Sequence, residues 1–124
     1  MIPLMAVTYV PSEDIWLVEE DYHFSLYGVQ DFIQRGFKTD LASVPRVFWR
    51  IIAPYELSVE AAVIHDHLYR NLGVADNIIL DREQVDNLFR LIMIEQGVPG
   101  WRCWLAHKMV RLAAWATWNN YKRR

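Results

Sequence analysis

The sequence has 124 residues, of which 53% are hydrophobic, and a formal net charge of −2. This length predicts a single domain over residues 1–124, mainly strands in 1–40 and mainly helices in 45–122. The single cysteine, Cys103, excludes an internal disulfide, and no apolar run approaches the roughly 20 residues of a membrane span. The first residues lack the basic stretch of a signal peptide, so we expect a protein that is not secreted by that route.

Charge is distributed unevenly along the chain. Residues 1–95 hold all 15 acidic residues and 7 of the 13 basic ones, which gives a net charge of −8. Residues 96–124 hold the other six basic residues and no acid, which gives +6. The terminal segment therefore either docks against an acidic face of its own domain or reserves positive charge for a partner.

The first 40 residues alternate between apolar and polar positions in short segments, which is typical of strands. Gly28 and the acidic run 19–21 separate these segments as turns. His23 falls on one of the predicted strands, and we interpret it as structural. The segments, preceded by a proline-flanked lead-in over 1–12, are 15–18, 22–27, 31–33 and 36–38.

Helical patterns dominate after residue 40. At the turn 39–45, Asp40 or Ser43 can satisfy free N–H groups, and a short helix over 46–52 is predicted to stop near Pro54. Further helices are expected from Ser58 to about 72–73, from Asp81 with its capping-box glutamine, and from about 101 to 120. We therefore expect an α+β fold in which a small N-terminal antiparallel β-meander is followed by three to four helices.

The most informative stretch is the predicted helix around His65 and Asp66. At 100° per residue, His65 falls on the apolar face of this helix, and Asp66 lies on its flank. A polar pair on a buried face costs a few kcal/mol unless it is hydrogen-bonded or coordinates an ion, and Asp86 on the next helix is the best partner.

Two interpretations of this pair remain open. In the first, His65 is a general base oriented by Asp86 while Asp66 holds a cation, which requires a solvent-reachable cleft at His65. In the second, the same residues form a sealed polar network, and the terminal tryptophans make a large apolar surface.

The motifs T-D-L-A-S-V-P at 39–45 and H-D-H-L-Y at 65–69, followed by Arg82 and Asp86, resemble a family of bacteriophage and prophage proteins of unknown function. That family shares T-D-x-A-S-V-P, H-D-x-L-Y and R-x-x-A-D-x-x-F signatures, and here Val85 replaces the usual alanine of the last one. The resemblance implies a phage or prophage origin, with a location in the host cytoplasm or the virion.

A second resemblance concerns residues 61–69, which read A-A-V-I-H-D-H-L-Y, together with Asp86. They are similar to the paired helices of phospholipase A2, closest to the disulfide-free form in parvovirus capsid proteins. The resemblance implies that His65 activates a water, Asp86 orients the imidazole and Tyr69 adds a supporting hydroxyl. It also implies that Asp66 binds calcium, since a hard cation takes oxygen ligands and stabilises an oxyanion.

The expected cofactor is Ca²⁺ or another divalent cation. The glycine-rich calcium loop of the phospholipases does not precede the helix, so Asp40 is the candidate to replace its ligands. We expect His65, Asp66, Asp86 and Asp40 to lie near one pocket. His67 is predicted to point away from His65, which disfavours a transition-metal site that contains both.

The terminal segment interleaves tryptophans with arginine and lysine. Core packing of an aliphatic stripe with some surface tryptophan is one interpretation, and binding of a membrane surface or of phage structural proteins is the other. The acidic body argues against nucleic acid. The tryptophans are Trp101, Trp104, Trp115 and Trp118, and the basic residues among them are Arg102, Lys108 and Arg111.

The sequence leaves two hypotheses for the function. The first is a hydrolase-like phage protein, metal-dependent and directed at an ester or lipid. Its alternative is a non-enzymatic virion or phage-morphogenesis component.

Overall fold

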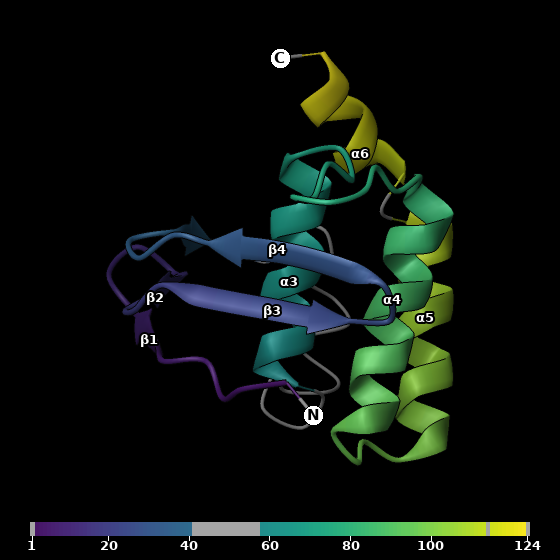
Figure 1. Cartoon of the computed structure of the whole chain (residues 1–124), viewed down its shortest axis with the longest axis horizontal. Coiled ribbons are helices and arrows are strands. Elements are labelled where there is room, and N and C mark those ends of the chain that lie inside the picture. Colours follow the sequence, from purple (N-terminus) through teal and green to yellow (C-terminus); the bar gives the residue numbers. More distant parts are fainter. Residues whose placement is uncertain (1, 41–57, 114, 124) are drawn as a thin grey trace.

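The computed structural model describes residues 2–40, 58–113 and 115–123, and its fold is the expected α+β arrangement (Figure 1). The predicted helix 46–52 and Ser43 of the predicted turn lie outside the described residues. The strands are β1 (Val7–Val10), β2 (Ile15–Val18), β3 (Tyr22–Leu26), β4 (Val29–Ile33) and β5 (Lys38–Thr39). The helices are α3 (Val59–Arg70), α4 (Arg82–Glu95), α5 (Gly100–Ala113) and α6 (Trp115–Lys122).

The strands form two small antiparallel sheets, so the expected N-terminal antiparallel strand region is confirmed. One sheet has the order β1-β2-β5 and the other is the β3–β4 hairpin. The chain returns from β4 to β2, because Gly36 N–H donates to the Val18 carbonyl at 2.8 Å and Val18 N–H donates to the Phe37 carbonyl at 2.9 Å. These bonds extend the β2–β5 pairing and leave β3–β4 as a separate layer.

The β3–β4 hairpin presents one apolar face to the helices. Tyr22 and Phe24 on β3 are buried, while His23 between them is exposed and stacks on Phe32. This alternation is what a strand with one solvated face requires. Asp31 is the buried polar residue of β4, and it is therefore directed at α3 rather than at water.

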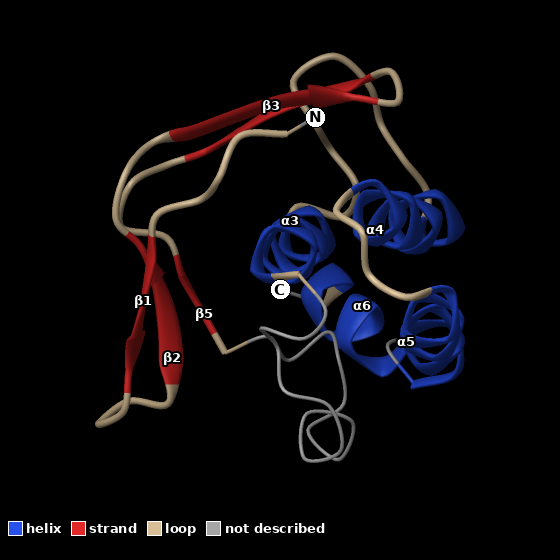
Figure 2. Ribbon diagram, turned by 90° about the horizontal axis from the view of Figure 1, so that it is seen from below, coloured by secondary structure: helices blue, strands red, loops and turns tan. Residues whose placement is uncertain are grey.

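Helix α3 is the central element of the fold. Figure 2 shows β3 on one side of it, β5 on a second, α4 on a third and α6 on a fourth. Eight of its 12 residues are buried, which a helix enclosed on all sides needs. Ser58 caps its first turn by accepting a hydrogen bond from Ala61 N–H at 3.0 Å, so the predicted N-cap is confirmed.

Helices α4 and α5 lie side by side and run in opposite directions (Figure 1). Asp81 and Gln84 form the predicted capping box at the start of α4. Cys103, Ala106 and Val110 pack the inner face of α5 into the core. Within the described ranges, no helix is long and apolar enough to cross a membrane.

The terminal segment forms two helices, so the prediction of one continuous helix from 101 to 120 is wrong. Helix α5 ends at Ala113 and α6 starts at Trp115, and α6 packs against α3. In Figure 2, α6 lies between α3 and α5. The break places Trp118 against Tyr69, with ring centroids 5.1 Å apart in an edge-to-face arrangement. No glycine or proline marks the break in the sequence.

Candidate functional site: a buried carboxylate hub

The carboxylate of Asp86 is the centre of a polar network between α3, α4 and α5. We call this network the Asp86 hub; its members are His65, Tyr69, Arg82, Asp86 and Arg111. His65 Nε2 lies 2.7 Å from its Oδ1, and the Tyr69 hydroxyl donates to the same oxygen at 2.6 Å. The predicted contact between the imidazole at 65 and the acid at 86 is therefore confirmed. Tyr69 also stands where the phospholipase resemblance places a supporting hydroxyl.

The helical period explains how two groups reach one oxygen. His65 and Tyr69 are four residues apart on α3, so their side chains lie on one face. Their rings are 4.3 Å apart, and Phe89 from α4 packs on the His65 ring at 4.7 Å. Asp86 is one turn before Phe89 on α4, which brings its carboxylate beside both rings.

Two arginines engage the second oxygen of Asp86. Arg111 Nη1 donates to Oδ2 at 2.9 Å, and Arg82 Nη2 lies 3.9 Å from the same atom. Burial raises the pKa of the Asp86 carboxyl, but the hydrogen bond and charge of His65 and the hydrogen bonds of Tyr69 and Arg111 outweigh it, so that its pKa is lowered. Asp86 is therefore a charged acceptor with donors on both oxygens.

The centre of the network, formed by His65, Tyr69 and Asp86, is sealed from solvent. His65 is 1% exposed, and Asp86 and Tyr69 are 0% exposed. The cleft that a general base at His65 requires is thus not present in the described part of the molecule. Within the described residues, His65, Tyr69 and Asp86 are hydrogen-bonded to one another and closed to solvent.

Arg82 and Arg111 are the members of the network that sequence reasoning missed. Arg82 donates through Nη2 to the carbonyl oxygens of Val110 and Arg111, at 3.0 and 2.7 Å, and through Nε to the Tyr69 hydroxyl at 3.2 Å. Both carbonyls belong to the last four residues of α5, whose carbonyls have no partner within the helix. Arg82 therefore caps the end of α5. Its place four residues before Asp86, within the R-x-x-A-D-x-x-F signature, indicates the contact with Asp86 but not the capping of α5.

Asp66 lies next to His65 in the chain but belongs to a different cluster. Its Oδ2 accepts from the Thr39 hydroxyl and lies 3.1 Å from Arg70 Nε. Among the described residues no donor reaches its Oδ1, although the side chain is fully buried. Burial raises the pKa of Asp66, and the charge of Arg70 and the Thr39 hydrogen bond oppose the shift only in part.

We expect Asp66→Asn to gain stability relative to the wild type as pH rises. Because the pKa of Asp66 is raised in the folded state, its favourable contribution is full below the unfolded pKa of about 3.9 and is lost as pH rises through the folded value. Asparagine has no such dependence. Urea unfolding between pH 4 and 8 measures the difference, with the exposed Asp76→Asn as surface control. A difference that stays flat, or that falls with pH, would contradict the raised pKa.

Arg70 occupies the space between the two carboxylates predicted to bind a cation. Besides its contact with Asp66, its Nη2 lies 3.9 Å from Asp40 Oδ1, and its Nη1 donates to the Lys38 carbonyl at 2.7 Å. No group of three or more His, Cys, Asp or Glu side chains that could hold a metal occurs among the residues described. The Arg70 guanidinium supplies one positive charge between the two acids, at the place where a bound cation would lie. The metal role of Asp40 and Asp66 stays a prediction.

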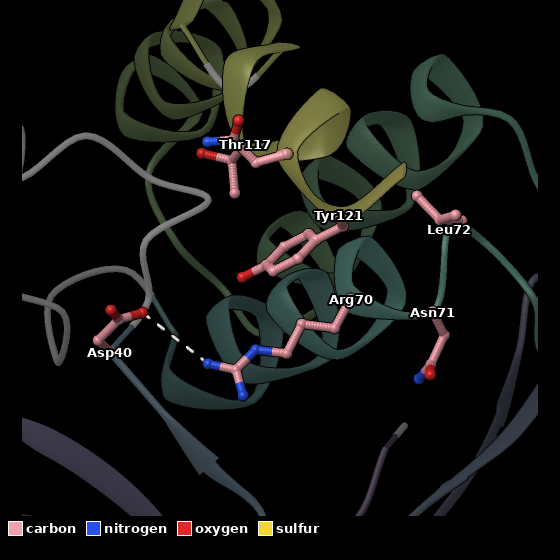
Figure 3. Close-up of a pocket in the computed structure, with 7 residues that line it drawn as sticks. Asp40, Arg70, Asn71, Leu72, Thr117 and Tyr121 are labelled. Atoms are coloured by element: carbon pink, nitrogen blue, oxygen red, sulfur yellow. Dashed lines mark ion pairs between the residues drawn. The ribbon is translucent and has the colours of Figure 1, made fainter. Parts of the chain in front are cut away.

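A pocket of about 680 Å³ opens beside Arg70. Figure 3 shows the Asp40, Arg70 and Tyr121 side chains converging there from separate parts of the fold. Of the four residues predicted to share a pocket, Asp40 lines this one, whereas His65, Asp66 and Asp86 do not. The hub and the pocket are therefore separate features.

His67 points away from His65, as its position two residues along the helix predicts. Its Nε2 lies 3.0 Å from Asp31 Oδ2 on β4, and its ring meets Phe37 edge-on at 5.5 Å. Burial lowers the pKa of His67, against the charge of Asp31. This pair joins α3 to the β3–β4 layer and does not contribute to the hub.

The fold and the hub define a small α+β domain whose central helix carries the H-D-x-L-Y motif. The chain belongs to the family described as "Protein of unknown function (DUF1353)", whose sequence model matches residues 16–110. The expected family of unknown function is thus confirmed, and its phage origin stays a prediction. No curated protein and no solved structure matches the chain. The match includes His65, Tyr69, Arg82 and Asp86 and ends one residue before Arg111.

Proposed function

We propose that this protein is a non-enzymatic virion or phage-morphogenesis component and that the Asp86 hub holds helices α3, α4 and α5 in one arrangement. The observation that carries the proposal is the sealing of a fully bonded carboxylate, 0% exposed, between three helices. Buried networks of this kind fix one arrangement of the elements that contribute to them. The phage setting, in the host cytoplasm or the virion, is supported by the resemblance of the motifs.

The charges of the hub also favour a structural role. A carboxylate assists a histidine base by stabilising the imidazolium that forms when the base takes a proton. The carboxylate of Asp86 is already balanced by Arg111 at 2.9 Å, with Arg82 at 3.9 Å. The Asp86 carboxylate is therefore paired with cations that belong to the fold itself, and the described residues leave the His65 ring only 1% exposed.

A hydrolase acting on an ester or lipid is the second candidate. It is favoured by one specific observation, the meeting of His65 Nε2 and the Tyr69 hydroxyl on a single oxygen of Asp86. This is the arrangement implied by the phospholipase resemblance, in which the other ring nitrogen takes the proton of a water. The reaction requires the network to open, because His65 is 1% exposed.

We expect His65→Ala to lose about 3 kcal/mol of unfolding free energy with no catalytic activity to lose. The substitution removes a buried ring and one partner of Asp86, and both effects destabilise. Urea unfolding measures the first, and turnover of a short-chain p-nitrophenyl ester and of a fluorescent phospholipid, with and without Ca²⁺, measures the second. His23→Ala is the matched control, because His23 is exposed on β3.

Two results would overturn this proposal. One is wild-type turnover that disappears in His65→Ala under conditions where circular dichroism shows the variant folded, which assigns the hub to catalysis. The other is a His65→Ala variant as stable as His23→Ala, which would show that the hub does not hold the helices together.

A further inference from the structure

A stripe of large side chains runs along the outward face of α5. Trp101 is 60% exposed, Trp104 is 55% exposed and Leu112 is 74% exposed, and Lys108 lies exposed between them. Their spacings of three and four residues keep them in one line, about 16 Å long at 1.5 Å per residue. Beyond the helix break, Trp115 is 55% exposed. An exposed aromatic line of this length is typical of an interaction surface.

The stripe is positively charged. Arg102 lies over the Trp101 ring at 5.1 Å, and the Lys108 ammonium lies 6.0 Å from the Trp104 ring centroid. The chain has no acid after Glu95. Two copies that met stripe to stripe would bring like charges together, so a symmetric pairing through α5 is disfavoured. The surface that covers the stripe has to be acidic.

An acidic surface of this kind lies at the other end of the molecule. Glu13 and Asp14 follow β1, and residues 19–21, all acidic and exposed, follow β2. Tyr9 on β1 is 43% exposed and packs on Trp16 at 5.2 Å, which adds aromatic area to the acidic end. Figures 1 and 2 agree that the β1–β2 hairpin and α5 lie at opposite ends of the longest axis.

We propose that copies of this chain associate head to tail, with the α5 stripe of one copy on the β1–β2 hairpin of the next. The two surfaces are complementary in charge, and both carry exposed aromatic rings. Since the two surfaces lie at opposite ends, the hairpin of a molecule cannot cover the α5 stripe of the same molecule. Each copy can, however, use both surfaces at once to bind two neighbours. Such a heterologous contact closes into a ring or continues as a filament. The inference rests on the proposed function, because a structural component acts by assembly.

We expect self-association that rises with protein concentration and weakens with salt, because charge pairs at the rim of an interface are screened. Sedimentation velocity from 1 to 500 µM, at 50 and 500 mM NaCl, measures it. Trp104→Ser and Lys108→Glu on the stripe, and Glu20→Lys in the acidic segment that follows the hairpin, should each raise the dissociation constant at least tenfold. Ile79→Ser and Asp76→Lys, exposed residues of the loop between α3 and α4, are the controls and should leave it unchanged.

A mixing experiment tests the head-to-tail geometry directly. Lys108→Glu and Glu20→Lys copies associate poorly alone, but a mixture restores opposite charges at each contact of the altered surfaces and should regain association. A mixture that stays dissociated, or a Glu20→Lys variant that associates like the wild type, would overturn the geometry. A chain that stays monomeric at 500 µM yet binds phosphatidylglycerol vesicles through Trp104 would overturn the proposal and assign the stripe to a membrane. The ester and phospholipid assays above do not depend on assembly, so a failure of one proposal is distinguishable from a failure of the other.

Discussion

Asp86→Ala should lose about 3–5 kcal/mol of unfolding free energy, the range for breaking a buried charge pair by removing one partner. The substitution leaves His65 Nε2 and the Tyr69 hydroxyl buried without their shared acceptor, and it leaves Arg111 without its carboxylate. Small domains have about 5–15 kcal/mol of stability in total, so the variant should be marginally folded at 25 °C. Urea denaturation followed by far-UV circular dichroism measures the loss.

Two comparisons show whether the loss comes from the network. The exposed Asp76→Ala controls for removal of a carboxylate and should change stability by less than about 0.5 kcal/mol. Tyr69→Phe should cost about 1–2 kcal/mol in the wild type and much less in the Asp86→Ala background, because its acceptor is gone there. If the two substitutions were additive, Tyr69 and Asp86 would not act as one unit.

Gly73→Ala should lose about as much unfolding free energy as Asp86→Ala, but for a steric reason. Gly73 has φ +79°, and a Cβ added there would lie 1.9 Å from the carbonyl oxygen of Leu80. The close approach is fixed by a hydrogen bond from Leu80 N–H to the Gly73 carbonyl at 2.8 Å. The left-handed backbone costs alanine about 1–2 kcal/mol, and the clash adds about 1–3 kcal/mol. Thermal unfolding should show the combined loss.

Gly28→Ala is the matched control for this prediction. Gly28 also has φ +79°, but a Cβ added there meets nothing within 4 Å. Only the backbone cost should remain, about 1–2 kcal/mol. Equal losses at the two positions would show that the loop between α3 and α4 yields to the added methyl group.

The hub contact could be predicted from the sequence because it depends on local periodicity. His65 and Tyr69 share a face of one helix, and Asp86 borders the apolar face of the next, so packing those two faces brings the three together. The cap at Ser58 and the capping box at Asp81 follow from equally local rules. Elements defined within one or two turns were therefore placed correctly.

The parts that the sequence did not reveal depend on long-range choices. The return of β5 to β2 is decided by backbone pairing between residues that are 21 and 23 positions apart, which alternation alone does not specify. The cap at the end of α5 comes from Arg82 on another helix, so the residues at the end of α5 do not predict it. The position of Arg70 between Asp66 and Asp40 likewise depends on how α3 meets β5.

The capping of α5 by Arg82 has a consequence for synthesis on the ribosome. The guanidinium of Arg82 needs the carbonyls of Val110 and Arg111, and Asp86 needs the Arg111 side chain. These partners are translated 25 or more residues after Asp86 and Arg82. Until then the nascent chain carries a helix pair with an uncompensated interior charge. We therefore expect the domain to complete its fold only after residue 111 is available, and early termination before residue 111 should yield a product that proteases degrade.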